Sequence, residues 1–446
     1  MTHKRDQTIQ ELQQALEALT KELEALKHPV PKDSTNSSIP TSKEMIPRTR
    51  SQREKSGNKP GGQPGHEGHR REPMDGERNI VRVETSHCEN CGADLSGVEG
   101  TIGRIAQEID IPPIQPITTE YQQVIKKCAC GHCNCPALPI EAEVSIGPEM
   151  SALITYLNVE HSLPYARLTQ ITEDVLGFAI SEGTVAKKLG LMQRKARGII
   201  GRIKKHIIDA PWVGSDETGT HIGGKKFWQW VWQSPKASYY VVDKRRGYGV
   251  VREHFTESYR GVLIHDCWSA QNNTPALSHQ HCHAHLIRNL QYAIDAERSV
   301  FAYLVQRLLK KSQRARDAIW EEGVTPERRQ AVIKYYQEEL EKLLAMPLSK
   351  PEELRLQKRL VKHRDWIFTF MNYPDVPPDN NSSERAIKAA KLKDKVSGGF
   401  RSEPGAARFA SLLSLTQTLR KQQLPILASL KAVLAGQDLP LFSSSG

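Results

Sequence analysis

The sequence predicts a multidomain α+β protein in which a mixed sheet is interrupted by a long helical region. Its 446 residues are too many for one compact core, so two to four domains are expected. Short apolar runs and segments of alternating aromatic or β-branched residues indicate strands, whereas longer amphipathic segments indicate helices. Strands are expected at 211–216, 227–232, 238–243 and 261–266, and helices at 148–206 and 296–371.

Three acidic residues that lie far apart in the chain occupy positions typical of a two-metal nuclease site. Asp216 and Asp266 each end an expected strand, and Glu384 lies in the first turn of a helix that Ser or Asn residues would cap. Mg²⁺ prefers oxygen ligands, and two such ions roughly 3.5–4 Å apart support in-line phosphoryl transfer. Spacing alone does not decide for a metal site, because acids at strand ends are common among 51 Asp and Glu residues.

Charge and composition favour nucleic acid as a partner. The formal net charge of +11 suits a polyanion, although a merely basic soluble protein is the alternative. No apolar stretch is long enough to span a bilayer, so no membrane partner is expected. The polar N-terminus MTHKRDQTIQ lacks an apolar signal region, which predicts a cytoplasmic, nucleoid-associated protein.

The N-terminal part is expected to be a helix followed by a linker. In residues 1–28, apolar residues alternate steps of three and four, which predicts a leucine-zipper-like oligomerisation helix and hence a homo-oligomer. An amphipathic helix docked on its own chain is the alternative. Residues 29–78 are rich in Ser, Pro, Gly, Lys and Arg, which predicts a basic flexible linker that either follows a phosphate backbone or is a solvated tether.

Six of the eight cysteines lie between Cys88 and Cys135, and they predict a zinc-binding module at 79–145. Two separated thiolate pairs supply the four soft ligands of a structural zinc site, and in a reducing compartment they indicate metal rather than disulfides. Free cysteines in a small β module are the alternative. The favoured ligands are Cys88, Cys91, Cys128 and Cys130, while Cys133, Cys135 and His132 compete for the second pair.

Residues 146–207 are expected to be a helical DNA-binding region. A helix at 165–175, a break at Gly177 and a basic helix that Ser181 would cap resemble a helix-turn-helix. A plain helical hairpin explains the same pattern, and the basic second helix favours DNA contact.

The remaining chain divides into a sheet domain at 208–295, a helical insertion at 296–373 and a closing part at 374–446. Cys282 and His285 would share a helix face, and a structural or substrate-contacting role is favoured over metal binding for this pair. The basic run after Glu384 either contacts DNA phosphates or forms a solvated helix face. The DNA-binding candidates are Arg385, Lys388 and Lys391.

Taken together, these segments resemble the DDE transposases of the insertion-sequence-66 family over nearly the whole chain. The resemblance rests on the combination of a leucine-rich first helix, the two-part cysteine module and a set of short motifs. These motifs are GGQPGHEGH, SDET, HDCW, CHAHLIRNL, NNSSERAIK and FASLLSLTQTLRKQQL. The second cysteine cluster is denser than the pair typical of the family, so the resemblance does not assign the zinc ligands. The CHAHLIRNL segment also departs from the form C-x-A-H-A-R-R, which does not support a role for Arg288.

The resemblance implies a ribonuclease-H-like α/β catalytic domain interrupted by a helical insertion. It also implies that Asp216, Asp266 and Glu384 form a catalytic triad binding two Mg²⁺ ions, for which Mn²⁺ could substitute. The expected function is a DNA transposase that binds the terminal repeats of an insertion sequence as double-stranded DNA, cleaves the strands and joins them to target DNA. Accessory proteins of the same element could take part. The alternatives are a nuclease or resolvase without strand transfer, and a transposase-derived DNA-binding regulator.

Overall fold

The computed structural model of the chain describes residues 32, 65, 67, 72–76, 79–112, 114–140 and 142–442. The chain forms two compact units, of which the smaller is Ser51–Ile117 and the larger combines Met1–Arg50 with Thr118–Gly446. The helix expected at 1–28 and most of the linker expected at 29–78 lie outside the described residues.

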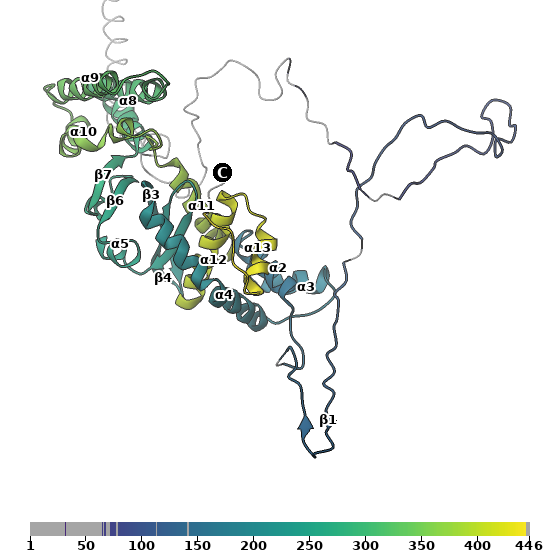
Figure 1. Cartoon of the computed structure of the whole chain (residues 1–446). Helices are drawn as coiled ribbons and strands as arrows, with labels where there is room; N and C mark the ends of the chain where they lie inside the picture. The colour runs from purple at the N-terminus through teal and green to yellow at the C-terminus, as the bar shows by residue number, and fades with distance from the viewer. Residues whose placement is uncertain are drawn as a thin grey trace, which may run out of the picture. The chain divides into compact units, whose positions relative to one another are not determined.

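A five-stranded mixed sheet forms the centre of the larger unit, in the order β5-β4-β3-β6-β7 (Figure 1). The strands β3, β4 and β5 pair antiparallel, whereas β6 pairs parallel with β3 and β7 parallel with β6. Their bounds are β3 Trp212–Ile222, β4 Lys225–Gln233, β5 Ser238–Asp243, β6 Tyr259–His265 and β7 Ala276–His281. The strands expected at 227–232, 238–243 and 261–266 are confirmed, and β7 was not expected.

The first strand is longer than the sequence suggested. The strand expected at 211–216 continues to Ile222, because β4 pairs with it as far as Lys225. The two strands are joined by Gly223 and Gly224, whose φ angles of 55° and 76° need residues without a Cβ. Asp216 therefore lies within β3 rather than at its end.

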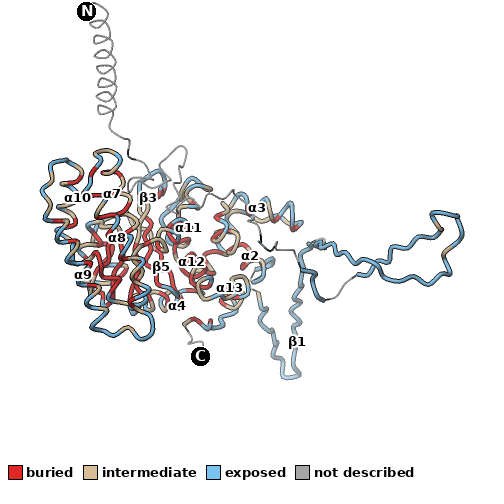
Figure 2. The backbone as a smooth tube through the Cα atoms, turned by 90° about the horizontal axis from the view of Figure 1, so that it is seen from above, coloured by how far each residue is buried: buried red, intermediate tan, exposed pale blue. Residues whose placement is uncertain are grey.

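Helices α4 (Glu182–Asp209), α11 (Asn381–Ser397) and α12 (Glu403–Lys421) pack on strands β3, β4 and β5. Figure 2 shows buried residues along the sheet and along these helices. The core here includes Trp230 and Trp232, which have no exposed surface. Ser181 caps α4 by accepting the N–H of Thr184, as expected. Around α4 lie α2 Pro148–Val159, α3 Tyr165–Asp174 and α13 Ile426–Leu434.

The expected helical insertion contributes to a second hydrophobic core. This core lies between strands β6 and β7 on one side and the helices that follow them on the other (Figure 1). Helices α7, α8, α9 and α10 supply most of the apolar residues of this core, together with two short 3₁₀ segments. The bounds are α7 His283–Glu297, α8 Val300–Ile319, α9 Pro326–Leu344, α10 Pro351–Lys362, η2 Arg364–Trp366 and η3 Thr369–Asn372. Shorter elements are α5 Tyr248–His254, α6 Ser269–Asn272, β1 Lys126–Lys127 and β2 Cys133–Asn134.

Candidate active site

The register between β3 and β6 brings the two aspartates to one level of the sheet. Gly214 pairs with Ile264, and Asp216 and Asp266 each lie two residues further along these parallel strands. Asp266 directly follows the last residue of β6. Beyond it, Cys267 adopts a φ of 72°, and the N–H of Trp268 donates to Asp266 Oδ1 at 3.2 Å. The sharp turn thus leaves Asp266 at the carboxyl edge of the strand.

Helix α11 lies on the face of β3 to which Asp216 points. A Cβ added at Gly214 would overlap Ser383 Oγ and lie 2.6 Å from Asn380 Oδ1, so the Gly214 side of β3 faces the start of α11. Asp216 shares this face, since side chains alternate along a strand. Glu384 lies in the first turn of α11 and is 24% exposed. The first turn of α11 therefore brings the third acid toward the two aspartates.

Hydrogen bonds to β3 and β4 hold the first turn of α11 in place. Asn380 stands at the N-cap position but does not cap the helix. Its Nδ2 instead donates to Ser215 O at 2.7 Å, and Gln233 Nε2 donates to Ser382 Oγ at 2.7 Å. The cap expected from Ser or Asn is thus replaced by a contact with the sheet. The position of Glu384 depends on this contact.

Asp266 and Glu384 both act electrostatically on Asp216. Burial raises the pKa of Asp216 well above its ordinary value, and the negative charges of Asp266, Glu217 and Glu384 raise it further. Two buried polar atoms near Glu384, His285 Nδ1 and Asn380 Oδ1, have no hydrogen-bond partner among the described residues. Carboxylates are ligands that could hold a hard divalent cation, although the three acids do not form one of the groups of described residues whose ligand atoms all lie within 4.8 Å of one another.

Glu384 is also paired with Arg288, a residue for which the sequence analysis supported no role. Arg288, in α7, donates from Nη2 to Glu384 Oε1 at 2.9 Å, and His285 Nδ1 lies 3.5 Å from the same oxygen. Arg288 lies 96 residues before Glu384, so only the tertiary structure reveals their contact. The spacing of His285 and Arg288 on one helix face was the only local signal for it.

Cys282 has a structural environment. Its Sγ accepts the N–H of Asn380 at 3.1 Å, and the thiol is fully buried at the start of α7. Cys282, His285 and Glu384 each offer one ligand atom, and these three atoms lie within 4.8 Å of one another. A metal ion could bridge this spacing. However, burial raises the pKa of Cys282 far above its ordinary value, which disfavours the thiolate that a metal binds. The favoured structural role is therefore consistent with the structure.

The opposite face of β3 carries a fourth carboxylate that the sequence analysis did not consider. Arg246 Nη2 donates to Glu217 Oε1 at 2.8 Å, and the Glu217 side chain is 1% exposed. The Arg246 guanidinium lies 4.3 Å from the ring centre of Trp228 and 3.7 Å from that of Trp268. Burial, reinforced by the charge of Asp266, raises the pKa of Glu217 to about 7. The Glu217–Arg246 pair and the two tryptophans thus stabilise the sheet on the face of β3 opposite the triad.

The three predicted DNA-binding residues of α11 differ in their surroundings. Arg385 and Lys388 are exposed. Lys391 is half-buried, and its Nζ donates to Gly219 O at 3.0 Å and to Asp394 Oδ2 at 3.3 Å. Arg385 and Lys388 are thus available to a ligand, whereas Lys391 already connects α11 with β3.

A comparison with protein families identifies the chain. The model of the transposase IS66 family matches residues 143–408, a range that contains all three acids of the candidate site. The chain belongs to the transposase IS66 family. This membership confirms the resemblance on which the sequence analysis relied and supports a role in transposition. A comparison with curated proteins gave no match.

The predicted zinc ligands of the transposase form two turns, one in each compact unit. Cys88 O accepts the N–H of Gly92 at 2.8 Å, and Cys128 O accepts the N–H of Gly131 at 2.9 Å. The N–H of Cys91 lowers the pKa of the Cys88 thiol, and the N–H of Cys130 lowers that of Cys128. Each turn therefore favours thiolates, while the four-cysteine zinc site remains a prediction.

The family model excludes Cys88, Cys91, Cys128 and Cys130, since it begins at residue 143. The α3 and α4 pair of the proposed DNA-binding region lies inside the matched range, with a break at Gly177, whose φ is 71°. This geometry fits both a helix-turn-helix and a plain helical hairpin. Within the described part of the transposase, no helix is both long and apolar enough to cross a bilayer.

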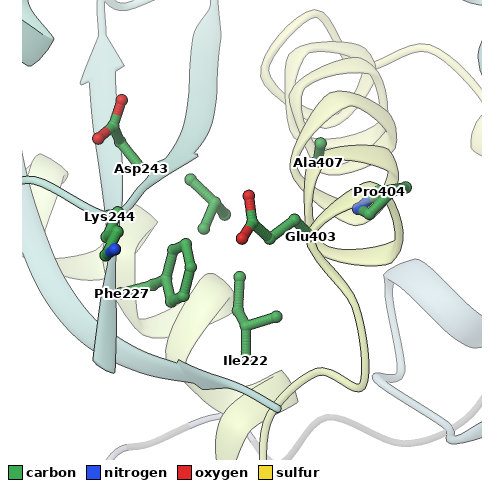
Figure 3. A pocket seen from close by; sticks show the side chains of 8 residues that line it. Ile222, Phe227, Asp243, Lys244, Glu403, Pro404 and Ala407 are labelled. Atoms are coloured by element: carbon green, nitrogen blue, oxygen red, sulfur yellow. The ribbon is translucent and has the colours of Figure 1, made fainter. Parts of the chain in front are cut away.

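A surface cavity of about 740 Å³ lies between the β4–β5 hairpin and the start of α12 (Figure 3). Phe227 and Ile222 form its apolar floor, with Asp243 and Glu403 at its sides. None of the three triad residues lines this cavity.

Proposed function

We propose that this IS66-family protein is a DNA transposase that cleaves the terminal repeats of an insertion sequence and joins them to target DNA. The observation that carries this proposal is that the register of β3 with β6 and the close approach of α11 to Gly214 bring Asp266 and Glu384 toward Asp216. Asp266 and Glu384 lie 50 and 168 residues after Asp216 in the sequence, and both act electrostatically on its carboxyl group. This arrangement lowers stability unless a cation binds there.

Asp216, Asp266 and Glu384 would hold the divalent ions in this proposal. Bound Mg²⁺ would activate water or a DNA 3′-hydroxyl and stabilise the leaving oxygen. Arg288 fixes the Glu384 carboxylate from the α7 side, while Asn380 and Gln233 fix the helix turn that carries it. The mixed five-stranded sheet, with acids on neighbouring strands β3 and β6 and a third on a helix covering β3, supports a ribonuclease-H-like catalytic domain.

DNA binding would involve several surfaces. Arg385 and Lys388 project from α11 close to Glu384 in sequence and are exposed, which suits contacts with the phosphates of the cleaved strand. Helices α3 and α4, with the zinc module, would bind the terminal repeats. Pairing of two ends would use a homo-oligomer formed through residues 1–28, and accessory proteins of the element could join the complex.

A cleavage and strand-transfer assay tests the proposal. Labelled duplexes carrying the element's terminal repeats are incubated with wild type, Glu384→Gln and Glu257→Gln, in Mg²⁺ and then in EDTA. We expect metal-dependent nicking at the repeat ends and joined products with wild type and with Glu257→Gln, because Glu257 is an exposed surface acid. Glu384→Gln should lower the cleavage rate by at least about 100-fold.

Other outcomes would identify the alternatives. Nicking without joined products would indicate a nuclease or resolvase. Binding of the repeats without any nicking, in wild type and variant alike, would indicate either a missing accessory factor or a DNA-binding regulator. Nicking by Glu384→Gln at the wild-type rate would exclude the proposed triad.

A further inference from the structure

Helix α8 of the insertion exposes a set of cations that has no acidic counterpart. Its 20 residues hold five Lys or Arg residues and one acid, Asp317. Four of the cations are exposed and fall within one side of the helix about 100° wide, because residues three, four or seven apart lie above one another. These four residues, called the α8 stripe below, are Arg307, Lys310, Lys311 and Arg314. Tyr303, which is 47% exposed, lies on the same side, and the Arg307 guanidinium lies 5.6 Å from its ring centre.

The next helix shows that this charge pattern is not general in the insertion. Helix α9 holds four basic and four acidic residues, and its Lys334 and Lys342 each pair with a glutamate three or four residues away. Among the described residues, the one ion pair made by α8 joins Arg316 with Asp317 and leaves out the stripe. Like charges three or four residues apart repel one another, so the α8 stripe slightly destabilises the free helix. A polyanion would remove this repulsion.

Hydrogen bonds connect the α8 stripe with the candidate active site. Lys310 Nζ donates to Gln306 Oε1 at 3.0 Å, and Gln306 Nε2 donates to Gln291 Oε1 of α7 at 3.1 Å. Gln291 lies one turn after Arg288, which donates to Glu384 Oε1 at 2.9 Å. Arg288 and Gln291 are partly exposed, and Lys310 is fully so. The accessible surface therefore continues from Glu384 across α7 to the α8 stripe.

The dimensions of the stripe suit a DNA backbone. From Arg307 to Arg314 the helix rises about 10 Å, at 1.5 Å per residue. This length corresponds to about three base-pair steps of 3.4 Å, so neighbouring phosphates lie within reach of the long side chains. In the proposed reaction one strand lies at Glu384, and the duplex beside the cleaved phosphate then needs a basic surface that adjoins this residue. The α8 stripe is such a surface.

We propose that the α8 stripe binds backbone phosphates of the terminal-repeat duplex next to the cleaved position. This inference rests on the proposed transposase function and deepens it. It gives the helical insertion a direct part in holding the transposon end against the triad, in addition to its packing on β6 and β7.

Two variants that remove three charges each from the insertion test this role. The α8 variant combines Arg307→Gln, Lys311→Gln and Arg314→Gln, and the α9 variant combines Arg328→Gln, Lys334→Gln and Lys342→Gln. All six side chains are exposed, so both variants should melt as wild type does. Because the two variants have the same net charge, any difference between them reports where the cations lie.

Binding of the full-length proteins to a terminal-repeat duplex is measured in EDTA over a series of salt concentrations. The α8 variant should bind about tenfold more weakly at 0.15 M salt, and the slope of log K against log salt should become less steep by about 2 to 3. The α9 variant should keep the wild-type slope. A third variant that keeps the charges, with Arg307→Lys, Lys311→Arg and Arg314→Lys, should restore both affinity and slope.

Hydroxyl-radical footprinting locates the contact on the DNA. Wild type and the α9 variant should protect the backbone within about one duplex turn of the cleaved position, and the α8 variant should lose this protection. If the α8 variant keeps the wild-type slope, weakens binding only as much as the α9 variant, or loses protection elsewhere, the inference is wrong. An unchanged slope with an unchanged footprint would leave the stripe to an acidic protein partner.

The two proposals fail in different ways. Binding in EDTA does not depend on the triad, so it tests the α8 stripe separately from cleavage. Nicking in Mg²⁺ that does not require Glu384 contradicts the proposed active site. Glu384-dependent nicking, combined with an α8 variant that binds as wild type does, contradicts only the role of the stripe.

Discussion

At the scale of single residues, the candidate active site is shaped by repulsion between acids. Asp216 has an ordinary pKa of 3.8, and its environment shifts this pKa well upward. The native state therefore retains a proton that the unfolded chain has already released. The contribution of Asp216 to stability is present at acid pH and is lost as the pH rises from about 3.8 through the folded pKa. Without metal, Asp216 destabilises the protein at neutral pH.

Replacing Asp216 by Asn should thus stabilise the metal-free protein while abolishing cleavage. In EDTA at pH 7.5, we expect the melting temperature of Asp216→Asn to exceed that of wild type, by roughly 2–4 °C for each kcal/mol of relieved repulsion. Adding Mg²⁺ should raise the melting temperature of wild type more than that of the variant. Thermal unfolding with exposed Asp375→Asn as control measures both effects. A variant less stable than wild type in EDTA would contradict the crowding of the acids.

On the opposite face of β3, the pair Glu217–Arg246 should contribute to stability. Arg246→Ala would leave the buried Glu217 without its cation and remove the contact with Trp228 and Trp268. We expect the free energy of unfolding to fall by roughly 1–3 kcal/mol, less than for a fully buried pair, because Arg246 is 34% exposed. Chemical denaturation measures the loss. The neighbouring Arg245→Ala, whose arginine side chain is 54% exposed, should lower the free energy of unfolding less, and equal losses would be inconsistent with a special role for Arg246.

At the scale of secondary-structure elements, the catalytic geometry depends on how closely α11 approaches β3. The approach is possible because Gly214 has no side chain on the face that the first turn of α11 covers. Three hydrogen bonds then hold that turn, from Asn380 to Ser215 and from Gln233 to Ser382 and Ser383. A small displacement of the turn would move Glu384 relative to the aspartates.

Gly214→Ala should therefore reduce activity more than stability. The added methyl group overlaps Ser383 and displaces the first turn, which we expect to lower cleavage about 100-fold at a cost of roughly 1–3 kcal/mol in unfolding free energy. Gly219→Ala on the same strand is the control, because the nearest atom to its Cβ is Lys226 Cε at 3.9 Å. Cleavage rates and denaturation curves of both variants test this prediction. Equal cleavage rates for Gly214→Ala and Gly219→Ala would show that the site tolerates the displacement of α11.

At the scale of the whole molecule, the two compact units each carry one predicted pair of zinc ligands. We expect one zinc ion per chain by elemental analysis. Cys88→Ser and Cys128→Ser should lose it, whereas Cys135→Ser should retain it, because the favoured ligands are Cys88, Cys91, Cys128 and Cys130.

The zinc content of these variants also tests the choice of ligands. Loss of zinc in Cys135→Ser with retention in Cys128→Ser would assign the second pair to the later cysteines. A wild-type protein without zinc would favour the alternative of free cysteines. Residual terminal-repeat binding after chelation would show whether the metal serves DNA recognition.

The sequence by itself determined the features that are encoded within a few neighbouring residues. Alternating residues in β4 and β5, the apolar run of β6 and the Ser181 cap are local signals, and each was predicted correctly. The family motifs around Asp216, Asp266 and Glu384 also lie within short segments, and the family match confirmed the resemblance that they carry.

Only the tertiary structure decided which distant residues meet. The register of β3 with β6 and the pairing of Arg288 with Glu384 depend on packing between segments far apart in the chain. Asp216 also lies within a strand rather than at its end, because pairing with β4 extends β3 past the local signal. Short-range propensity sets where an element begins, but the energy of pairing and burial sets how far it runs and what it contacts.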